Sequence, residues 1–94
     1  MRFSETFLDE VVARNDIADV VSSYVTLTRK GSNLFGLCPF HNEKTPSFSV
    51  APDKQIYHCF GCKKGGSVIN FIMEIEGLSF PEAVAFLAKR ANLP

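Results

Sequence analysis

The sequence predicts an α+β fold, in which an antiparallel sheet formed by the middle of the chain packs with helices from the N- and C-terminal parts. Apolar residues recur at helical spacing near both ends of the chain. Between them, β-branched residues alternate with polar ones, and short runs of Gly, Pro, Asn and Asp mark turns. Because 94 residues suit one domain, we expect a single domain over 1–94, with helices over 4–23, a sheet over 24–62 and helices over 67–91.

Two short helices are expected at the N-terminal end. Ser4 or Thr6 can cap the first, which runs to about Arg14, and Asp16 begins the second. Apolar positions of the second helix recur at i, i+3, i+4 and i+7: Ile17, Val20, Val21 and Tyr24. Each helix therefore lays one apolar stripe on a core.

An antiparallel meander is expected next. Val25 and Leu27 alternate with Thr26 and Thr28, which predicts a strand that ends near Gly31, with Val25 and Leu27 facing the core. Further strands are predicted over 34–37, 47–50 and 55–59, with turns at 30–33 and 51–54. Alternation leaves open which residues of the later strands face solvent: Phe48 with Val50 or Ser47 with Ser49, and Ile56 or Tyr57.

Two more helices are predicted after the sheet. Ser67 caps the first, which stops at Gly77, and Ser79 with Glu82 forms a capping box at the start of the second. The predicted buried stripes are Val68, Phe71, Ile72 and Ile75 in the first helix, and Phe80, Ala83, Val84, Leu87 and Ala91 in the second.

Composition argues against several classes of protein. Three cysteines cannot all pair in disulfides, and leftover thiols in a small chain are typical of intracellular or metal-binding proteins. The first residues lack the unbroken apolar run of a signal peptide, and no run reaches membrane-spanning length, so we expect a cytoplasmic protein with no membrane partner. A formal net charge of zero argues against a simple polycation that coats nucleic acid.

Two pairs of metal-binding side chains lie in the sheet region. Cys38 and His41 bracket two residues, and Cys59 and Cys62 repeat that spacing. Two such pairs on tight turns that a hairpin brings together are typical of zinc ribbons. We expect all four side chains to bind one zinc ion, whose tetrahedron they fill, so that the metal is structural and holds no water. Gly61 is expected to supply a positive φ in the second turn.

Two other interpretations compete at this site. His58 stands beside Cys59 and could replace His41, but adjacent residues of a strand leave on opposite faces. The Cys59 and Cys62 pair could be a redox motif, but such a motif follows a strand and directly starts a helix, whereas residues 63–66 intervene here. We therefore favour His41 as the ligand and a metal site over redox catalysis.

The middle of the chain is basic and aromatic. Basic residues between positions 25 and 65 outnumber the acidic Glu43 and Asp53. Exposed aromatic rings between lysines would stack on the bases of single-stranded nucleic acid, while the lysines pair with phosphates. The candidate DNA-binding residues are Arg29, Lys30, Lys44, Phe48, Lys54 and Tyr57. The same pattern also suits lysines on an ordinary solvated face and aromatics inside a small core.

Three segments resemble the N-terminal zinc-binding domain of bacterial DnaG-type DNA primases: CPFHNEKTPSF at 38–48, YHCFGC at 57–62 and the glycine pair at 65–66. The resemblance implies a five-stranded antiparallel sheet packed among helices. It also implies a domain that engages the single-stranded template where RNA primer synthesis begins during DNA replication. Lys63 and Lys64 depart from the small residues that many members have there, which favours higher general DNA affinity.

The resemblance also implies that different domains of the whole protein have different functions. In the family a separate acidic, metal-binding domain transfers nucleotides, and a C-terminal domain contacts the replicative helicase. Glu43 and Asp53, each next to a lysine, do not form the clustered carboxylates that this reaction needs. We therefore expect no enzymatic activity from this chain alone, with the single-stranded template and the primase catalytic domain as its partners at the replication fork.

Two alternatives stay open. In one, the zinc merely holds the fold, and the module acts through protein contacts that regulate the primase catalytic domain of its own or a neighbouring chain. In the other, the chain comes from a phage-type primase fused to a helicase, or from a primase-like protein of a mobile element. The residues fit the bacterial primase better.

Overall fold

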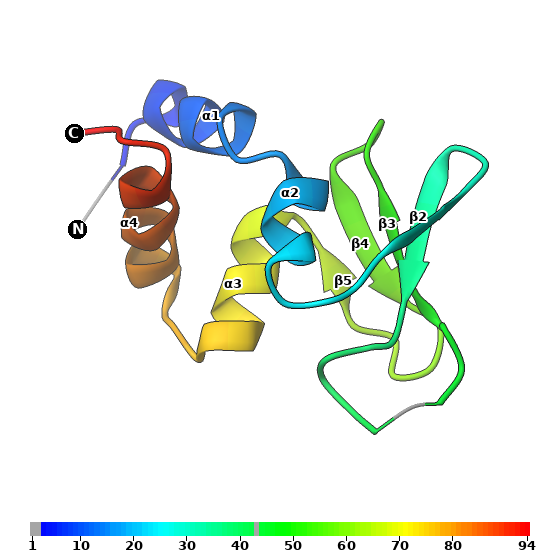
Figure 1. Cartoon of the computed structure of the whole chain (residues 1–94). Coiled ribbons are helices and arrows are strands. Elements are labelled where there is room, and N and C mark those ends of the chain that lie inside the picture. The colour runs from blue at the N-terminus through cyan, green and yellow to red at the C-terminus, as the bar shows by residue number, and fades with distance from the viewer. Residues whose placement is uncertain (1–2, 43) are drawn as a thin grey trace.

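The computed structural model describes residues 3–42 and 44–94; Met1, Arg2 and the acidic Glu43 considered above lie outside the described residues. In chain order the elements are α1 (Glu5–Ala13), α2 (Ile17–Ser22), β1 (Thr28–Lys30), β2 (Asn33–Gly36), β3 (Phe48–Ala51), β4 (Ile56–Cys59), β5 (Gly65–Gly66), α3 (Val68–Glu76) and α4 (Phe80–Arg90). In chain order two helices thus precede the strands and two follow them, as the sequence predicts, and the helices lie together on one side of the sheet (Figure 1).

The strands form one antiparallel, five-stranded sheet in the order β1-β2-β3-β4-β5. The α+β fold and the five-stranded sheet are thereby confirmed. Strand β5 is only a pair of glycines, which carries no side-chain pattern to predict it from. Strand β1 starts at Thr28 rather than at Val25, because the amide of Val25 still donates to the carbonyl of Val21 (2.9 Å) at the end of α2.

Side-chain caps define where the helices begin. The capping residues of α1, α2, α3 and α4 are Ser4, Asp16, Ser67 and Ser79, in that order. The side chain of each accepts a hydrogen bond from a backbone amide in the first turn of its helix. Ser4, rather than Thr6, caps α1. Gly77 ends α3 in the left-handed conformation, with φ at 65°. None of the described helices has both the length and the apolar character needed to cross a membrane.

The buried stripe of α4 differs from the prediction. Phe80, expected in the core, is 43% exposed and Ala91 is only partly buried, whereas Ala88 is buried. Helical periodicity gives the direction of a side chain, but not how far neighbouring elements extend along the helix. Phe80 is the first residue of α4, and its ring stays largely in solvent.

The helices cover one face of the sheet and leave the other open (Figure 1). Helix α2 contacts β3, α3 contacts β4 and β5, and α4 packs on both α1 and α3. Four aromatic rings meet in the core, with centroids 5.4 to 6.2 Å apart: Phe40, Phe48, Tyr57 and Phe71. This aromatic cluster joins the sheet to α3.

Phe48 and Tyr57 belong to this core, with 0% and 2% of their surface exposed. The expectation that they stack on nucleic acid bases is therefore wrong. Strand alternation gives the reason: Tyr57 stands two residues before Cys59 and shares its face, and Phe48 pairs directly with Cys59 across β3 and β4. An inward-pointing Cys59 places both rings on the covered face.

One buried polar side chain, Asn15, holds α1 against α4. It is 0% exposed, and its Nδ2 donates to the carbonyls of Val11 (2.8 Å) and Leu87 (3.0 Å). Its Oδ1 accepts a hydrogen bond from the guanidinium of Arg90 (3.2 Å). Removal of such a buried, hydrogen-bonded side chain lowers the free energy of unfolding, because its former partners stay buried without a hydrogen bond.

We expect Asn15→Ala to lower the free energy of unfolding by about 2 to 3 kcal/mol, since it leaves buried partners unsatisfied. Urea denaturation of the zinc-loaded chain measures this. The matched control is Asn42→Ala in the exposed loop after β2, which should stay within about 0.5 kcal/mol of the parent. Equal losses in both variants would contradict the structural role of Asn15.

Candidate metal centre and sheet surface

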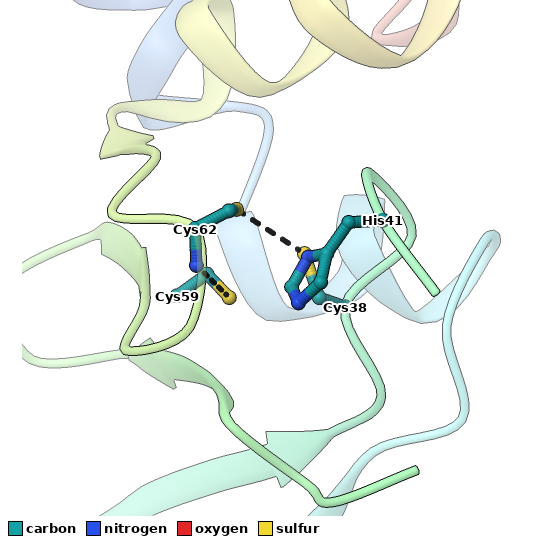
Figure 2. Close-up of side chains that lie close together, drawn as sticks. All are labelled: Cys38, His41, Cys59 and Cys62. Atoms are coloured by element: carbon teal, nitrogen blue, oxygen red, sulfur yellow. Dashed lines mark hydrogen bonds between the residues drawn. The ribbon is translucent and has the colours of Figure 1, made fainter. Parts of the chain in front are cut away.

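The four candidate ligands come from two loops at one end of the sheet. Cys38 and His41 follow β2, while Cys59 ends β4 and Cys62 lies in the turn towards β5. Figure 2 shows the two pairs facing each other, and their ligand atoms all lie within 4.8 Å of one another. The described residues contain no other group of three or more metal-binding side chains within such a distance.

The distances fit a tetrahedral zinc ion. The Sγ atoms of Cys38 and Cys62 are 3.8 Å apart. Sulfurs that each bind zinc at about 2.3 Å are separated by about 3.8 Å at the tetrahedral angle. Cys38 and Cys59 are buried, and so is the Nδ1 atom of His41. Four protein ligands complete the tetrahedron, so the site is structural rather than catalytic.

Backbone amides support the sulfurs on both sides. The amide of Phe40 donates to Cys38 Sγ and the amide of Cys62 donates to Cys59 Sγ, each at 3.4 Å. The hydroxyl of Ser47 lies 3.7 Å from Cys59 Sγ. Such bonds stabilise thiolates, which are the form that binds zinc.

Burial and these hydrogen bonds shift the pKa values of Cys38 and Cys59 in opposite directions. Burial acts to raise the pKa of Cys59, but hydrogen bonds from the Cys62 amide and the Ser47 hydroxyl outweigh it and lower the pKa to about 6. Burial raises the pKa of Cys38 to about 12, against the amide of Phe40. The hydrogen bonds therefore favour the thiolate of Cys59, which is the form that binds zinc, whereas burial works against the thiolate of Cys38.

The competing interpretations fail on geometry. His58 lies outside the ligand cluster, and its ring meets Phe60 edge to face at 4.8 Å. The Cys59 and Cys62 pair does not open a helix, because α3 begins only at Val68. The redox interpretation therefore lacks the helix N-terminus that activates such a thiol.

Zinc content distinguishes the two histidines. We expect His41→Ala to lose most of its zinc and much of its helix signal, because metal binding supplies folding free energy. His58→Ala, the matched control, should keep one zinc ion per chain. Elemental analysis and circular dichroism measure both. Zinc loss in His58→Ala together with retention in His41→Ala would reverse the ligand assignment.

The left-handed residue of the second ligand turn is Lys63, with φ at 67°, and not Gly61 as expected. The amide of Lys63 donates to the carbonyl of Cys59 at 2.9 Å, which places the sharp bend after Cys62. A residue with a Cβ is strained in this conformation. Glycine, which has no Cβ, is therefore favoured at this position on conformational grounds alone.

We expect Lys63→Gly to raise the free energy of unfolding by about 0.5 to 1 kcal/mol, since relief of left-handed strain exceeds the added entropy of the unfolded chain. Thermal denaturation of the zinc-loaded chain measures the change. Lys54→Gly is the control, because Lys54 is exposed in a turn and has no positive φ. A gain in Lys54→Gly of the same size would contradict the explanation.

The open face of the sheet carries a different set of aromatic groups from the predicted one. Strand pairing aligns five residues in one row across it: Thr28, Phe35, Ser49, His58 and Gly65. Phe60, two residues beyond His58, is 58% exposed. Leu37 and Ile56 are also exposed, at 51% and 41%. The signal for this assignment was present in the sequence, because His58 and Phe60 flank the inward-pointing Cys59.

The predicted basic residues do not gather at one place. Lys30 shares the open face, since it alternates with Thr28, but Arg29 pairs with Leu34 and leaves on the other face at the sheet edge. Lys54 is exposed in the turn between β3 and β4, at the same end of the sheet as Lys30. Lys44 is exposed in the loop before β3, at the metal end. Their roles in DNA binding stay predictions.

Gln55 fixes the turn that carries Lys54. Its φ is 56°, its Nε2 donates to Asp16 Oδ1 (2.9 Å), and its Oε1 accepts from the amide of Ile17 (2.9 Å). These bonds join the tip of the β3–β4 hairpin to the start of α2. Lys64, which lies just before β5, forms an ion pair with Glu74 of α3 at 3.2 Å.

Comparison with known proteins identifies close similarity over nearly the whole chain. Residues 3–94 match the family described as CHC2 zinc finger, the zinc ribbon of DnaG. The chain is 56% identical to a DNA primase of Staphylococcus epidermidis and 55% identical to one of Staphylococcus aureus strain COL, in each case over 99% of its own length and 16% of the relative. It therefore spans a small part of these relatives.

A solved structure has the same fold. The crystal structure of the Aquifex aeolicus primase, which comprises zinc-binding and RNA polymerase domains, superposes with a TM-score of 0.87 at 48% sequence identity. The match covers 92% of this chain and 21% of that one.

Proposed function

Because the chain belongs to the CHC2 zinc-finger family of DnaG, we propose that this zinc-binding domain binds the single-stranded template of a DNA primase. In this role it helps to select the sites where RNA primers begin. The proposal extends to a bacterial replication fork as the place of action, since the similar proteins are bacterial DNA primases.

The observation that supports template binding is the composition of the open face. The exposed ring of Phe60 meets the half-buried ring of His58 edge to face, and the half-buried Phe35 lies in the same row as His58. Stacking of a base on an aromatic ring is worth about 1 to 3 kcal/mol and tolerates any sequence. Lys30 and Lys54 at the hairpin end of the sheet supply positive charge for phosphates.

Primer synthesis is proposed to take place on another domain of the longer protein. The described residues hold no cluster of carboxylates suited to magnesium; their one metal-binding cluster consists of Cys and His. Nucleotide transfer needs clustered carboxylates. The proposed partner is a catalytic domain that corresponds to the RNA polymerase domain in the Aquifex aeolicus structure, and a further domain is proposed to contact the replicative helicase.

A second function has its own support. Leu37 and Ile56 are large apolar side chains exposed on the open face. Exposed apolar side chains favour protein docking when they gather on one surface. In this alternative the sheet binds and regulates the catalytic domain, and single-stranded DNA does not compete for it.

Titration of labelled single-stranded oligonucleotides at two salt concentrations tests the proposal. Lys30→Ala should weaken binding and reduce the salt slope by about 0.7, the value for one phosphate contact on a single strand. Phe60→Ala should weaken binding at least about fivefold with an unchanged slope, because stacking is not ionic.

Lys89→Ala is the control, because Lys89 is exposed on α4, away from the sheet (Figure 1). It should behave as the parent. If the parent binds no oligonucleotide at low salt, or if Lys30→Ala and Phe60→Ala both bind like the parent, the open face is not the template surface. Such a result would favour the alternative in which the open face binds the catalytic domain.

A further inference from the structure

The open face contains a hollow beside the β1–β2 hairpin. Its volume is about 650 Å³, within the range of about 300 to 1,000 Å³ typical of small-ligand sites. Six side chains line it: Thr26, Thr28, Lys30, Phe35, Leu37 and Pro46. We call it the β1–β2 hollow. It lies on the Lys30 side of the sheet, whereas the His58 and Phe60 pair lies across β3 from it.

Gly36 lies in the wall of the hollow, where the backbone of β2 approaches the segment before β1 closely. A Cβ at this position would lie 2.6 Å from the carbonyl oxygen of Thr26 and 2.9 Å from Cγ1 of Val25. The glycine therefore lets the segment before β1 lie directly against the end of β2. This close approach brings Thr26 into the wall of the hollow beside Thr28.

The chemistry of the lining suits a nucleotide. Phe35, Leu37 and Pro46 give apolar surface, and Lys30 gives a positive charge. Within residues 3–42 and 44–94, the structure records no hydrogen bond to the hydroxyl of Thr26 or Thr28. A hydroxyl both donates and accepts, so it can contact the edge of a base. Among the residues that the structure describes, no acidic side chain lines the hollow to repel a phosphate.

We propose that the β1–β2 hollow is a subsite for one unpaired nucleotide of the template, in which Thr26 and Thr28 set the base preference. The base lies on Phe35, the two hydroxyls contact its polar edge, and Lys30 pairs with its phosphate. This inference rests on the proposed template-binding function and deepens it. The rings of His58 and Phe60 then hold neighbouring bases of any identity, because stacking does not discriminate strongly.

The test separates base preference from affinity. The zinc-loaded chain is titrated with labelled oligothymidylates whose central three positions vary, using Thr26→Val, Thr28→Val and the double variant. Valine keeps the shape of threonine and removes the hydroxyl. Each substitution should lower affinity for the best oligonucleotide about twofold to tenfold and leave the poorest unchanged. The double variant should rank the oligonucleotides weakly or not at all.

Two further variants serve as controls. Thr26→Ser keeps the hydroxyl and should keep the ranking. Thr6→Val makes the same substitution on the exposed face of α1 and should behave as the parent. Zinc content and melting temperature of every variant show that the fold is intact. Loss of ranking in Thr26→Ser as well as in Thr26→Val would contradict a role for the hydroxyl.

The outcomes distinguish this inference from the function it rests on. If the valine variants keep the ranking while Lys30→Ala still weakens every oligonucleotide, template binding stands and the subsite is overturned. The same holds if the parent binds all oligonucleotides equally. If the parent binds none, both are overturned. In amide NMR spectra, shifts at Thr28 and Phe35 caused by the oligonucleotide support the subsite, whereas shifts caused only by an added polymerase domain overturn it.

Discussion

Ligation of zinc by Cys38, His41, Cys59 and Cys62 joins the loop after β2 to the turn after β4 at one end of the sheet. Zinc binding contributes about 10 to 16 kcal/mol in small zinc-finger peptides, whereas the net stability of a domain is about 5 to 15 kcal/mol. The ion is therefore comparable in free energy to the whole fold. The helices, the aromatic cluster and the open face all depend on a sheet whose end this ion closes.

The same ligation sorts the two faces of the sheet. Cys59 points under the helices, so Tyr57 does too, and Phe48 follows because it pairs with Cys59. His58 and Phe60 must then leave on the open face. The alternation of side chains along β4 thus places the metal ligand on one face and the proposed template surface on the other. A shift of β4 by one residue would move its buried ring into solvent and its exposed side chains into the core.

Local signals made much of this predictable. The spacing of the ligand pairs identified the metal site, and Ser67, Gly77 and Ser79 marked helix ends through bonds within one turn. What could not be predicted depends on tertiary contacts. The two glycines of β5 carry no pattern, and the exposure of Phe80 depends on how far its neighbours extend. The β1–β2 hollow depends on how closely Gly36 approaches Val25 and Thr26 across the hairpin.

A chain of zero net charge gains little from long-range attraction to nucleic acid. Its proposed contacts are short-range: rings at Phe35, His58 and Phe60, and a few lysines at the sheet's ends. Such contacts give weak binding by an isolated domain. In the proposed arrangement, a tethered catalytic domain that holds the template would raise the local concentration of DNA to roughly the millimolar range, where weak contacts are populated. Low affinity then suits the proposed function, because a tethered domain that dissociates quickly from every sequence can distinguish sites without staying bound at any of them.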